Sequence, residues 1–382
     1  MVQRTVFGPE HERFRKVVRT FLTDEVFPDY PNWRRDGAPP RWFWRRAGEV
    51  GILGIGVPEE HGGLGGSNMK HSAVVTEEIQ RLGLALGGLR VHTDIAMPYF
   101  LEYADSEQRA RWLPGLVSGE SVVALGISEP GAGSDIKSMS TRAHRDGDHY
   151  VVNGAKTFIS NGAACDLLVL ACRTSASPGR GGLSVLVVET DTVGFARGRK
   201  LDKLGLSAQD LAELSFVDMR VPVANLLGSE GDGFTMLTSN LAQERLSIAL
   251  NSQASAESTL QATVSAMSGR QPTQRDKFAL AECRAEIAAG QALIDEALRS
   301  LVDGQLDGRD AAIAKLYATE LHGRVVDRCT RILGVEHYVG DDIVGQFFLD
   351  GRVSRIYGGS SEIMKVIISR EFDFSSTSRE SS

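Results

Sequence analysis

The spacing of apolar residues divides the chain into a helical zone, a strand-rich zone and a second helical zone. From Glu10 to about Val117, apolar residues recur at helical spacing, and Pro- and Gly-rich loops interrupt the pattern. After Gly233 the chain is rich in Ala, Leu, Glu, Gln and Arg, and residues 278–301 keep one face apolar. Both outer zones therefore predict helical bundles.

The middle zone, from about residue 120 to 227, predicts an all-β domain. Its predicted strands are residues 122–127, 150–152, 167–171, 183–188 and 214–217. Asn153-Gly154 indicates a tight turn between two strands, and a flexible loop is expected at residues 175–182. Because strands do not alternate with helices here, a doubly wound nucleotide-binding sheet is disfavoured.

These zones give an α+β protein with three domains. The expected bounds are 1–118 for an N-terminal all-α domain, 119–227 for a central β domain, 228–373 for a C-terminal helical bundle and 374–382 for a flexible tail. The length of 382 residues and the 42% of hydrophobic residues allow this many domains, each with a packed core.

Charge and segment composition exclude several function classes. The net charge of −7 disfavours a mainly electrostatic role on nucleic acid or on an anionic membrane. No apolar run approaches the roughly 18 residues of a membrane span, and the first 21 residues carry charges where a secretory signal is apolar. A cytoplasmic location is expected. The four cysteines have no metal-site spacing and are predicted to be buried, so we expect no metal.

Four segments have compositions that suit a ligand site, although each also has a purely structural reading. Residues 127–135 form a Gly- and Ser-rich loop after a strand, suited to phosphate or a heteroaromatic ring. Residues 153–162 place Phe158 and Ser160 on one face of a strand. Residues 241–246 put Glu244 beside Arg245 in an apolar helix, and residues 355–364 contain a Gly-Gly break before a new helix. The structural alternatives for the four segments are, in order, a turn, a half-buried strand, a solvated ion pair and the start of a helix. Each alternative would give the same sequence pattern.

A fifth segment, residues 33–46, is basic and aromatic. Such a composition superficially suits single-stranded nucleic acid, but a solvated helix face with buried aromatic residues is the favoured interpretation.

Taken together, residues of about 10 to 371 resemble the acyl-CoA dehydrogenases, and more narrowly their long-chain and isovaleryl branch. Five motifs occur in the family's order: GILGIGVPEEHGG at 51–63, HTDIAMPY at 92–99, SEPGAGSD at 128–135, NGAK through NG at 153–162, and YGGSSEIM at 357–364. The resemblance implies an N-terminal helical domain, a central β-barrel and a C-terminal four-helix bundle, in agreement with the three zones.

The resemblance also implies FAD-dependent α,β-dehydrogenation of an acyl thioester in fatty acid metabolism. A base removes the α-proton, and the β-hydrogen leaves as hydride to flavin N5. Most of the family carries its catalytic Glu directly after the tyrosine of the C-terminal motif, where this chain has Gly358. The long-chain and isovaleryl branch carries it on the bundle helix before an arginine, which is the position of Glu244. We therefore predict Glu244 as the base.

Other roles carry over by position. The Gly358 N–H would bind the thioester oxygen, and Gln243, Arg245 and Gly359 would adjoin the substrate. Residues expected to contact FAD are Ile127, Ser128, Ser134, Phe158, Ile159, Ser160, Arg270, Gln274, Gly334, Ser360, Ser361 and Glu362, with Ser134 also at the substrate. An acyl-CoA or acyl-carrier-protein substrate, electron transfer flavoprotein as acceptor, and a homotetramer or homodimer are expected by family habit.

The departures from the family lie where it binds the FAD adenosine across a subunit interface. Gln274 follows Arg270 by four positions where the family's glutamine follows its arginine by eleven, and the Gln-x-x-Gly-Gly motif is Arg-Ile-Leu-Gly-Val at 331–335. These changes leave two alternatives open. The fold also hosts flavin N-oxygenases and nitroalkane oxidases, and a non-catalytic acyl-CoA- or FAD-binding partner subunit would have the same sequence pattern.

Overall fold

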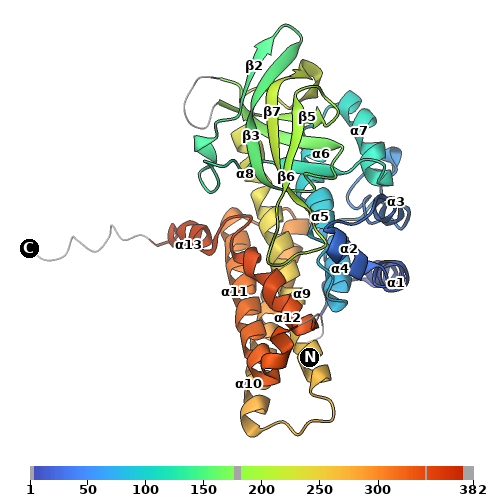
Figure 1. Ribbon diagram of the computed structural model, residues 1–382, viewed down its shortest axis with the longest axis vertical. Coiled ribbons are helices and arrows are strands. Elements are labelled where there is room, and N and C mark those ends of the chain that lie inside the picture. The colour runs from blue at the N-terminus through green and yellow to red at the C-terminus, as the bar shows by residue number, and fades with distance from the viewer. Residues whose placement is uncertain (1–3, 176–181, 340–341, 373–382) are drawn as a thin grey trace, which may run out of the picture.

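The computed structural model describes residues 4–175, 182–339 and 342–372, and it has the expected three parts (Figure 1). The N-terminal part is helical. Its helices are α1 Pro9–Phe21, α2 Tyr30–Asp36, α3 Arg41–Glu49, α4 Met69–Arg81, α5 Gly87–Arg90, α6 Met97–Tyr103 and α7 Ser106–Ser118, with π-helical turns η1 Leu22–Val26 and η3 Val91–Ala96. Trp33 and Trp44 are buried in its core with Phe21 and Phe43, so the aromatic residues of segment 33–46 pack inside the domain.

The central part is an eight-stranded sheet. Its strands are β1 Val123–Gly126, β2 Arg142–Asp146, β3 His149–Ser160, β4 Leu167–Arg173, β5 Leu183–Glu189, β6 Phe195–Lys200, β7 Leu211–Pro222 and β8 Leu226–Leu227. The strand order is β6-β7-β3-β2-β4-β5-β8, and β1 pairs in parallel with β4. β4 and β5 read as continuous apolar runs because both faces of these strands are buried.

The C-terminal part is a bundle of long helices followed by shorter ones. Its helices are α8 Gly233–Ser239, α9 Leu241–Ala266, α10 Gln274–Val302, α11 Gly308–Leu333, α12 Ile343–Gly351 and α13 Ser361–Ser369. α10 begins at a capping box in which the Thr273 side chain accepts from Asp276 N, and α11 begins where Asp307 accepts from the N–H groups of Arg309 and Asp310. No helix among the described residues is long and apolar enough to cross a membrane.

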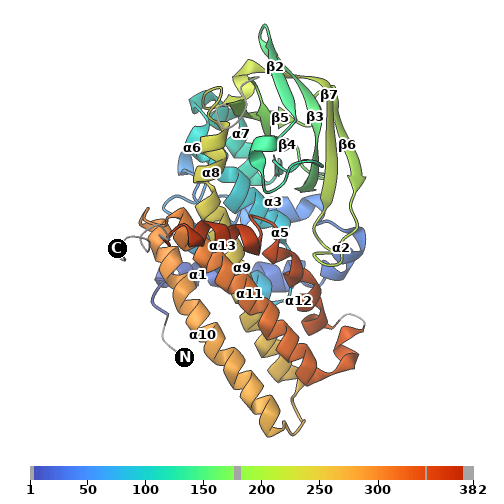
Figure 2. The ribbon, with the colours of Figure 1, turned by 90° about the vertical axis from the view of Figure 1, so that its left-hand side faces the viewer.

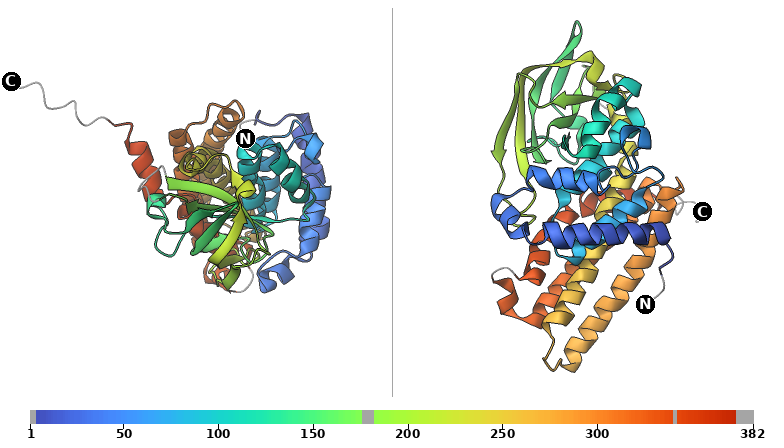
Figure 3. Two further views of the ribbon diagram at one scale, coloured as in Figure 1. Left: turned by 90° about the horizontal axis from the view of Figure 1, so that it is seen from above. Right: turned by 90° about the vertical axis from the view of Figure 1, so that its right-hand side faces the viewer.

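The three parts meet around the first turns of α9. Figure 2 shows the sheet at one end of the molecule and the long bundle helices at the other, with α13 across the near end of the bundle. The N-terminal helices flank both (Figure 3). α4 packs on α9, so that Ala73, Leu246 and Ile294 share one buried apolar cluster. The start of α9 is thereby enclosed from several sides.

The structure confirms the three-domain fold and corrects one local prediction. Asn153-Gly154 is not a hairpin turn, because both residues lie inside β3, where the register against β7 shifts. Gly154 has a φ of 155°, and a Cβ there would meet Thr141, so the dipeptide marks a bulge and a close approach. β2 and β6 were missed since their residues are mostly exposed and polar. The predicted loop lies mostly, and the tail wholly, outside the described residues.

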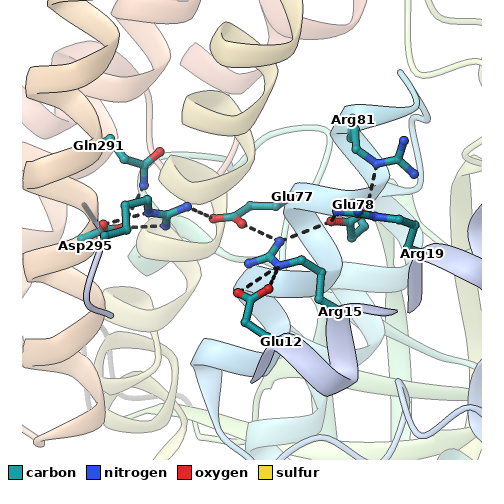
Figure 4. Close-up of polar contacts among 9 residues, drawn as sticks. Glu12, Arg15, Arg19, Glu77, Glu78, Arg81, Gln291 and Asp295 are labelled. Carbon is teal, nitrogen blue, oxygen red and sulfur yellow. Dashed lines mark hydrogen bonds and ion pairs between the residues drawn. The ribbon is translucent and has the colours of Figure 1, made fainter. Parts of the chain in front are cut away.

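A network of ion pairs fastens the N-terminal helices to the bundle (Figure 4). Arg4 bridges Glu77 of α4 and Asp295 of α10, at 2.8 and 2.7 Å. Glu78, whose side chain is 2% exposed, accepts from arginines on two helices, Arg15, Arg19 and Arg81. Burial opposes ionisation of Glu78, but the hydrogen bonds from Arg19 and Arg81 outweigh it and lower its pKa.

Glu78→Gln should destabilise the protein by about 1–3 kcal/mol, because charge-assisted hydrogen bonds are lost around a buried group. The contribution of Glu78 is present above its usual pKa and is lost as pH falls through the lowered value. The difference in urea midpoint between wild type and variant should therefore shrink on acidification. A difference that grows towards low pH would contradict this assignment.

Candidate active site

The loop at 127–135 is fixed to β3 by a buried ion pair. Lys156 Nζ lies 2.8 Å from Glu129 Oε1, and the two side chains are 0% and 2% exposed. Lys156 also donates to the Ile127 carbonyl oxygen, and Glu129 accepts from Ser140 and Thr141. Burial favours the neutral acid, but the hydrogen bonds outweigh it and lower the pKa of Glu129 to about 2. The loop is thus held in one position at the end of β1.

The residues at the end of β3 form the surface that this loop adjoins. Phe158 has a φ of 58° and its side chain is exposed, a strained placement for an aromatic residue. Ile159 is buried beneath it, and Ser160 Oγ accepts from Gln209 Nε2 at 2.7 Å. Thr157 N donates to Ser128 O, which joins strand and loop. One surface therefore includes Ile127, Ser128 and Ser160. Ser134 is exposed further along the loop.

Glu244 lies in the first turn of α9 and is buried. Its Oε1 has no hydrogen-bond partner among the described residues. Burial raises the pKa of Glu244 to about 8, although the charge of Arg245 opposes the shift. Tyr99 of α6 lies beside it, and burial together with the Glu244 charge raises the Tyr99 pKa. A buried carboxyl with a perturbed pKa and an unused oxygen is typical of a proton-transfer group.

The turn between η8 (Arg352–Arg355) and α13 packs against α9. Gly358 and Gly359 have φ values of 62° and 94°, in the region that favours glycine. A Cβ on Gly358 would collide with Ile248 Cδ1, and Ile248 lies one helical turn after Glu244. The space beside Gly358, where most of the family is expected to have its catalytic Glu, is therefore occupied by Ile248.

The other predicted residues near this turn have defined partners. Gln243 Nε2 donates to the Asp94 carbonyl oxygen at 2.8 Å, and Arg245 Nη1 donates to the Gly308 carbonyl oxygen at 3.3 Å. Arg245 Nε has no partner among the described residues. Ser360 caps α13 by accepting from Ile363 N, while Ser361 Oγ donates to Glu320. The side chain of Glu362 is exposed.

Three predicted cofactor residues lie at the other end of the bundle. Arg270 lies between α9 and α10, Gln274 is the first residue of α10, and Gly334 caps the C-terminus of α11. The 26 residues of α9 rise about 39 Å from the turn of Glu244 to that end. Arg270 is paired with Glu336 at 3.1 Å. Within one chain these residues are not brought together with Glu244.

The sequence did not single out Lys315, which the structure places beside the turn. Its Nζ donates to the Gly359 carbonyl oxygen, and its Cε lies 3.7 Å from the position of a Cβ on Gly358. The residue is 1% exposed, and burial together with Arg245 lowers its pKa to about 8. The sequence signal that could have found Lys315 is its position as a cation among the alanines of α11.

The arginines of segment 33–46 mostly bind groups of this chain. Arg41 pairs with Asp166 of the loop before β4, and Arg46 pairs with Glu25 and Glu49. Arg45 is exposed and makes no ion pair among the described residues. The cysteines are buried and free, and the described residues contain no cluster of metal-ligand side chains.

Comparison with known proteins extends over these same residues. Residues 8–120 match the acyl-CoA dehydrogenase N-terminal domain, 124–219 the middle domain and 231–372 the C-terminal domain. The chain belongs to the acyl-CoA dehydrogenase family. It is an FAD-dependent enzyme of that reaction class, and the predicted fold, cofactor and activity are confirmed at this level.

Individual relatives cover nearly the whole acyl-CoA dehydrogenase chain. It is 38% identical over 379 residues to the mitochondrial long-chain specific acyl-CoA dehydrogenase of Mus musculus, covering 96% of this chain and 87% of that protein. It is 31% identical to the mitochondrial isovaleryl-CoA dehydrogenase of Pongo abelii, covering 95% and 89%. The crystal structure of an acyl-CoA dehydrogenase from Geobacillus kaustophilus superimposes with a TM-score of 0.94 at 42% identity, covering 97% and 100%.

The residues at the end of β3 and in the loop at 127–135 fit a flavin. An exposed aromatic ring in a strained backbone position, Phe158, offers a stacking surface that nothing in this chain covers among the described residues. Gln209 Oε1, next to Ser160, is buried without a partner among them. A Cβ on Gly131 or Gly133 would meet nothing within 4 Å, so the loop has open space around its backbone.

Glu129→Gln should leave the Lys156 ammonium buried without its carboxylate and lower the free energy of unfolding by roughly 3–5 kcal/mol. The loosened loop should also reduce the flavin that copurifies. The double variant with Lys156→Met should recover part of the stability, because both charges are gone. Denaturant unfolding and flavin absorbance measure both effects, and additive losses in the double variant would exclude a direct pair.

Gly358→Ala should destabilise the acyl-CoA dehydrogenase more than Gly269→Ala does. Both glycines have positive φ, but a Cβ on Gly269 meets nothing within 4 Å, so this control isolates the backbone cost of about 1 kcal/mol. Ile248→Ala alone is destabilising because Ile248 is buried, but in this background the further cost of Gly358→Ala should fall to the backbone cost seen at Gly269, because the collision is gone. Equal melting temperatures for the two single variants would show that Ile248 does not restrict this position.

Proposed function

We propose that Glu244 is the base that removes the α-proton of an acyl-CoA thioester in this enzyme. The observation that carries the proposal is a buried carboxyl with an unpartnered Oε1 and a pKa near 8, opposite a turn that carries no side chain at Gly358. A base whose pKa lies near the working pH transfers protons effectively.

The remaining groups orient the thioester and exclude water. The Gly358 N–H would donate to the thioester oxygen, and Lys315 holds this turn through the Gly359 carbonyl. Ile248 and Tyr99 shield the Glu244 carboxyl from solvent, which strengthens its interactions. When FAD is bound, it accepts the β-hydrogen as hydride. Ile127, Ser128, Phe158, Ile159 and Ser160 would line its ring, and Ser134, Ser360, Ser361 and Glu362 would contact the rest.

Acyl-CoA is favoured over a carrier-protein substrate. A carrier protein would need the α3 arginines at 41, 45 and 46 as docking groups. Two of them, Arg41 and Arg46, are already paired with carboxylates inside this chain. By family analogy, electron transfer flavoprotein accepts the electrons, and a homotetramer or homodimer brings Arg270, Gln274 and Gly334 of one subunit to the FAD of another.

Glu244→Gln should keep bound flavin and lose roughly 10²–10⁴-fold in the rate of anaerobic flavin bleaching by acyl-CoA. The amide matches the size of the carboxyl but cannot accept the proton. Retained bleaching in this variant would contradict the assignment. Rapid oxygen consumption by the reduced wild type would instead favour an oxidase.

The raised pKa sets the direction of two pH dependences. Because the ionised form is the base, wild-type kcat/KM should rise with pH through about 8. Folding favours protonated Glu244, so this residue costs stability as pH rises from its usual pKa through the folded value. Glu244→Gln should therefore melt above wild type at alkaline pH, and the gap should close near pH 4.

A further inference from the structure

Arg90, at the end of α5, is a buried cation with almost no partners. The residue is 9% exposed, and it makes no ion pair among the described residues. Its one hydrogen bond there runs from Nη1 to the Ser247 carbonyl oxygen at 3.4 Å. A guanidinium has five N–H donors, and buried arginines are ordinarily paired. The other four N–H donors have no partner in the described part of the chain, and their nitrogens are not fully enclosed by it.

Two small cavities meet at Arg90. One, of about 10 Å³, is lined by Arg90 with Ile55, Thr93 and Asp94 among others. The second, of about 20 Å³, is lined by Arg90 with Asn251 and His322 among others. Each has room for a group of about the size of one water molecule.

The carboxylates that line the cavities already have hydrogen-bond donors. Asp94 accepts from Ser247 Oγ at 2.6 Å and from Thr93 Oγ1 at 2.9 Å. Asp350 accepts from Leu206 N and from Gln346 Nε2. Neither lies within ion-pair distance of Arg90 in the part of the chain that the structure describes. The two carboxylates share the cavity walls with Arg90 without forming an ion pair with it.

A further unused polar atom lies on the second cavity. His322 Nε2 is buried and has no partner in the described ranges. Burial lowers the pKa of His322 to about 4, so the ring is neutral near pH 7 and carries one N–H. A neutral imidazole can donate to an oxygen beside the guanidinium.

Arg90 is connected to the candidate base along two elements. Ser247, whose carbonyl it contacts, follows Glu244 by three residues, or about 4.5 Å of helix rise. In the other direction, η3 and α6 lead from Arg90 to Tyr99, which lies beside Glu244. The same two elements therefore line the carboxyl of Glu244 and the guanidinium of Arg90.

We propose that Arg90 ends the acyl-binding pocket and binds a carboxylate on the far end of the acyl chain, so that the preferred substrates are ω-carboxyacyl thioesters. This inference rests on the proposed function, since it needs the acyl chain to start at Glu244. A guanidinium matches a carboxylate in a bidentate geometry, whereas a methyl end would leave the buried charge unpaired.

The test compares CoA thioesters of equal chain length that differ at the far end. One set of three, octanoyl-, 8-hydroxyoctanoyl- and suberyl-CoA, ends in a methyl group, a hydroxyl and a carboxylate. Two pairs of other lengths, hexanoyl- with adipyl-CoA and decanoyl- with sebacyl-CoA, compare the methyl with the carboxylate end. Flavin bleaching gives kcat/KM, and calorimetry with the matching non-reactive thioether analogues gives affinity. The proteins are wild type, Arg90→Leu, Arg90→Lys, and Arg45→Leu as an exposed-arginine control.

Wild type and the control should prefer the carboxylate end by roughly 10- to 100-fold in both readouts. Arg90→Leu should lose this preference and gain on the methyl-ended member, while Arg90→Lys should keep part of it. If Arg90→Leu does not fold, the ratio of kcat/KM between carboxylate- and methyl-ended thioesters, measured in wild type and in Arg90→Lys, still tests the proposal.

Three outcomes separate the two proposals. Equal use of methyl and carboxylate ends by wild type, or an unchanged ratio in both Arg90 variants, overturns the assignment of Arg90 and leaves Glu244 untouched. A preference of wild type for the hydroxyl over the carboxylate overturns the anionic end group. Tight, Arg90-dependent binding of the suberyl analogue without bleaching by any thioester would refute dehydrogenation and support the subsite.

Discussion

The position of the loop at 127–135 against the end of β3 depends on the buried ion pair between Lys156 and Glu129. The pair joins a loop that has few contacts of its own to the strand that ends at Phe158 and Ser160. Each charge alone would be costly to bury, and together they fix the distance between the loop backbone and the ring-stacking surface. Without it, Ser128 and Ser134 would belong to a mobile glycine-rich turn.

A second constraint comes from α9, which contributes to two surfaces at once. Its first turns present Glu244 and Ile248 to the turn at Gly358, and they present Ser247 and Asn251 to the cavities at Arg90. Neighbouring residues on a helix point in directions about 100° apart, so one rigid element can define both the reactive end and the far end of a ligand. The ion-pair network around Glu78 and Arg4 keeps the N-terminal helices against this element.

Much of the fold was predictable because its apolar patterns are strong. β4 and β5 are continuous apolar runs, and α10 was expected at nearly its observed length. The motifs also located Glu244 and Gly358 on facing elements. The features that escaped prediction depend on tertiary contacts. The sequence around Gly154 predicts a turn, and only the fold shows that Thr141 packs against this residue. Arg90 and Lys315 have the sequence pattern of surface cations, and only the fold shows that both are buried. The placement of Ile248 in the space beside Gly358 has no signature in the sequence.

That placement couples two positions of the chain. Any side chain introduced at Gly358 requires the end of the Ile248 side chain to move, because a Cβ at Gly358 would collide with Ile248 Cδ1. Substitutions at the turn and on α9 are therefore not independent, and the effect of one depends on which residue occupies the other.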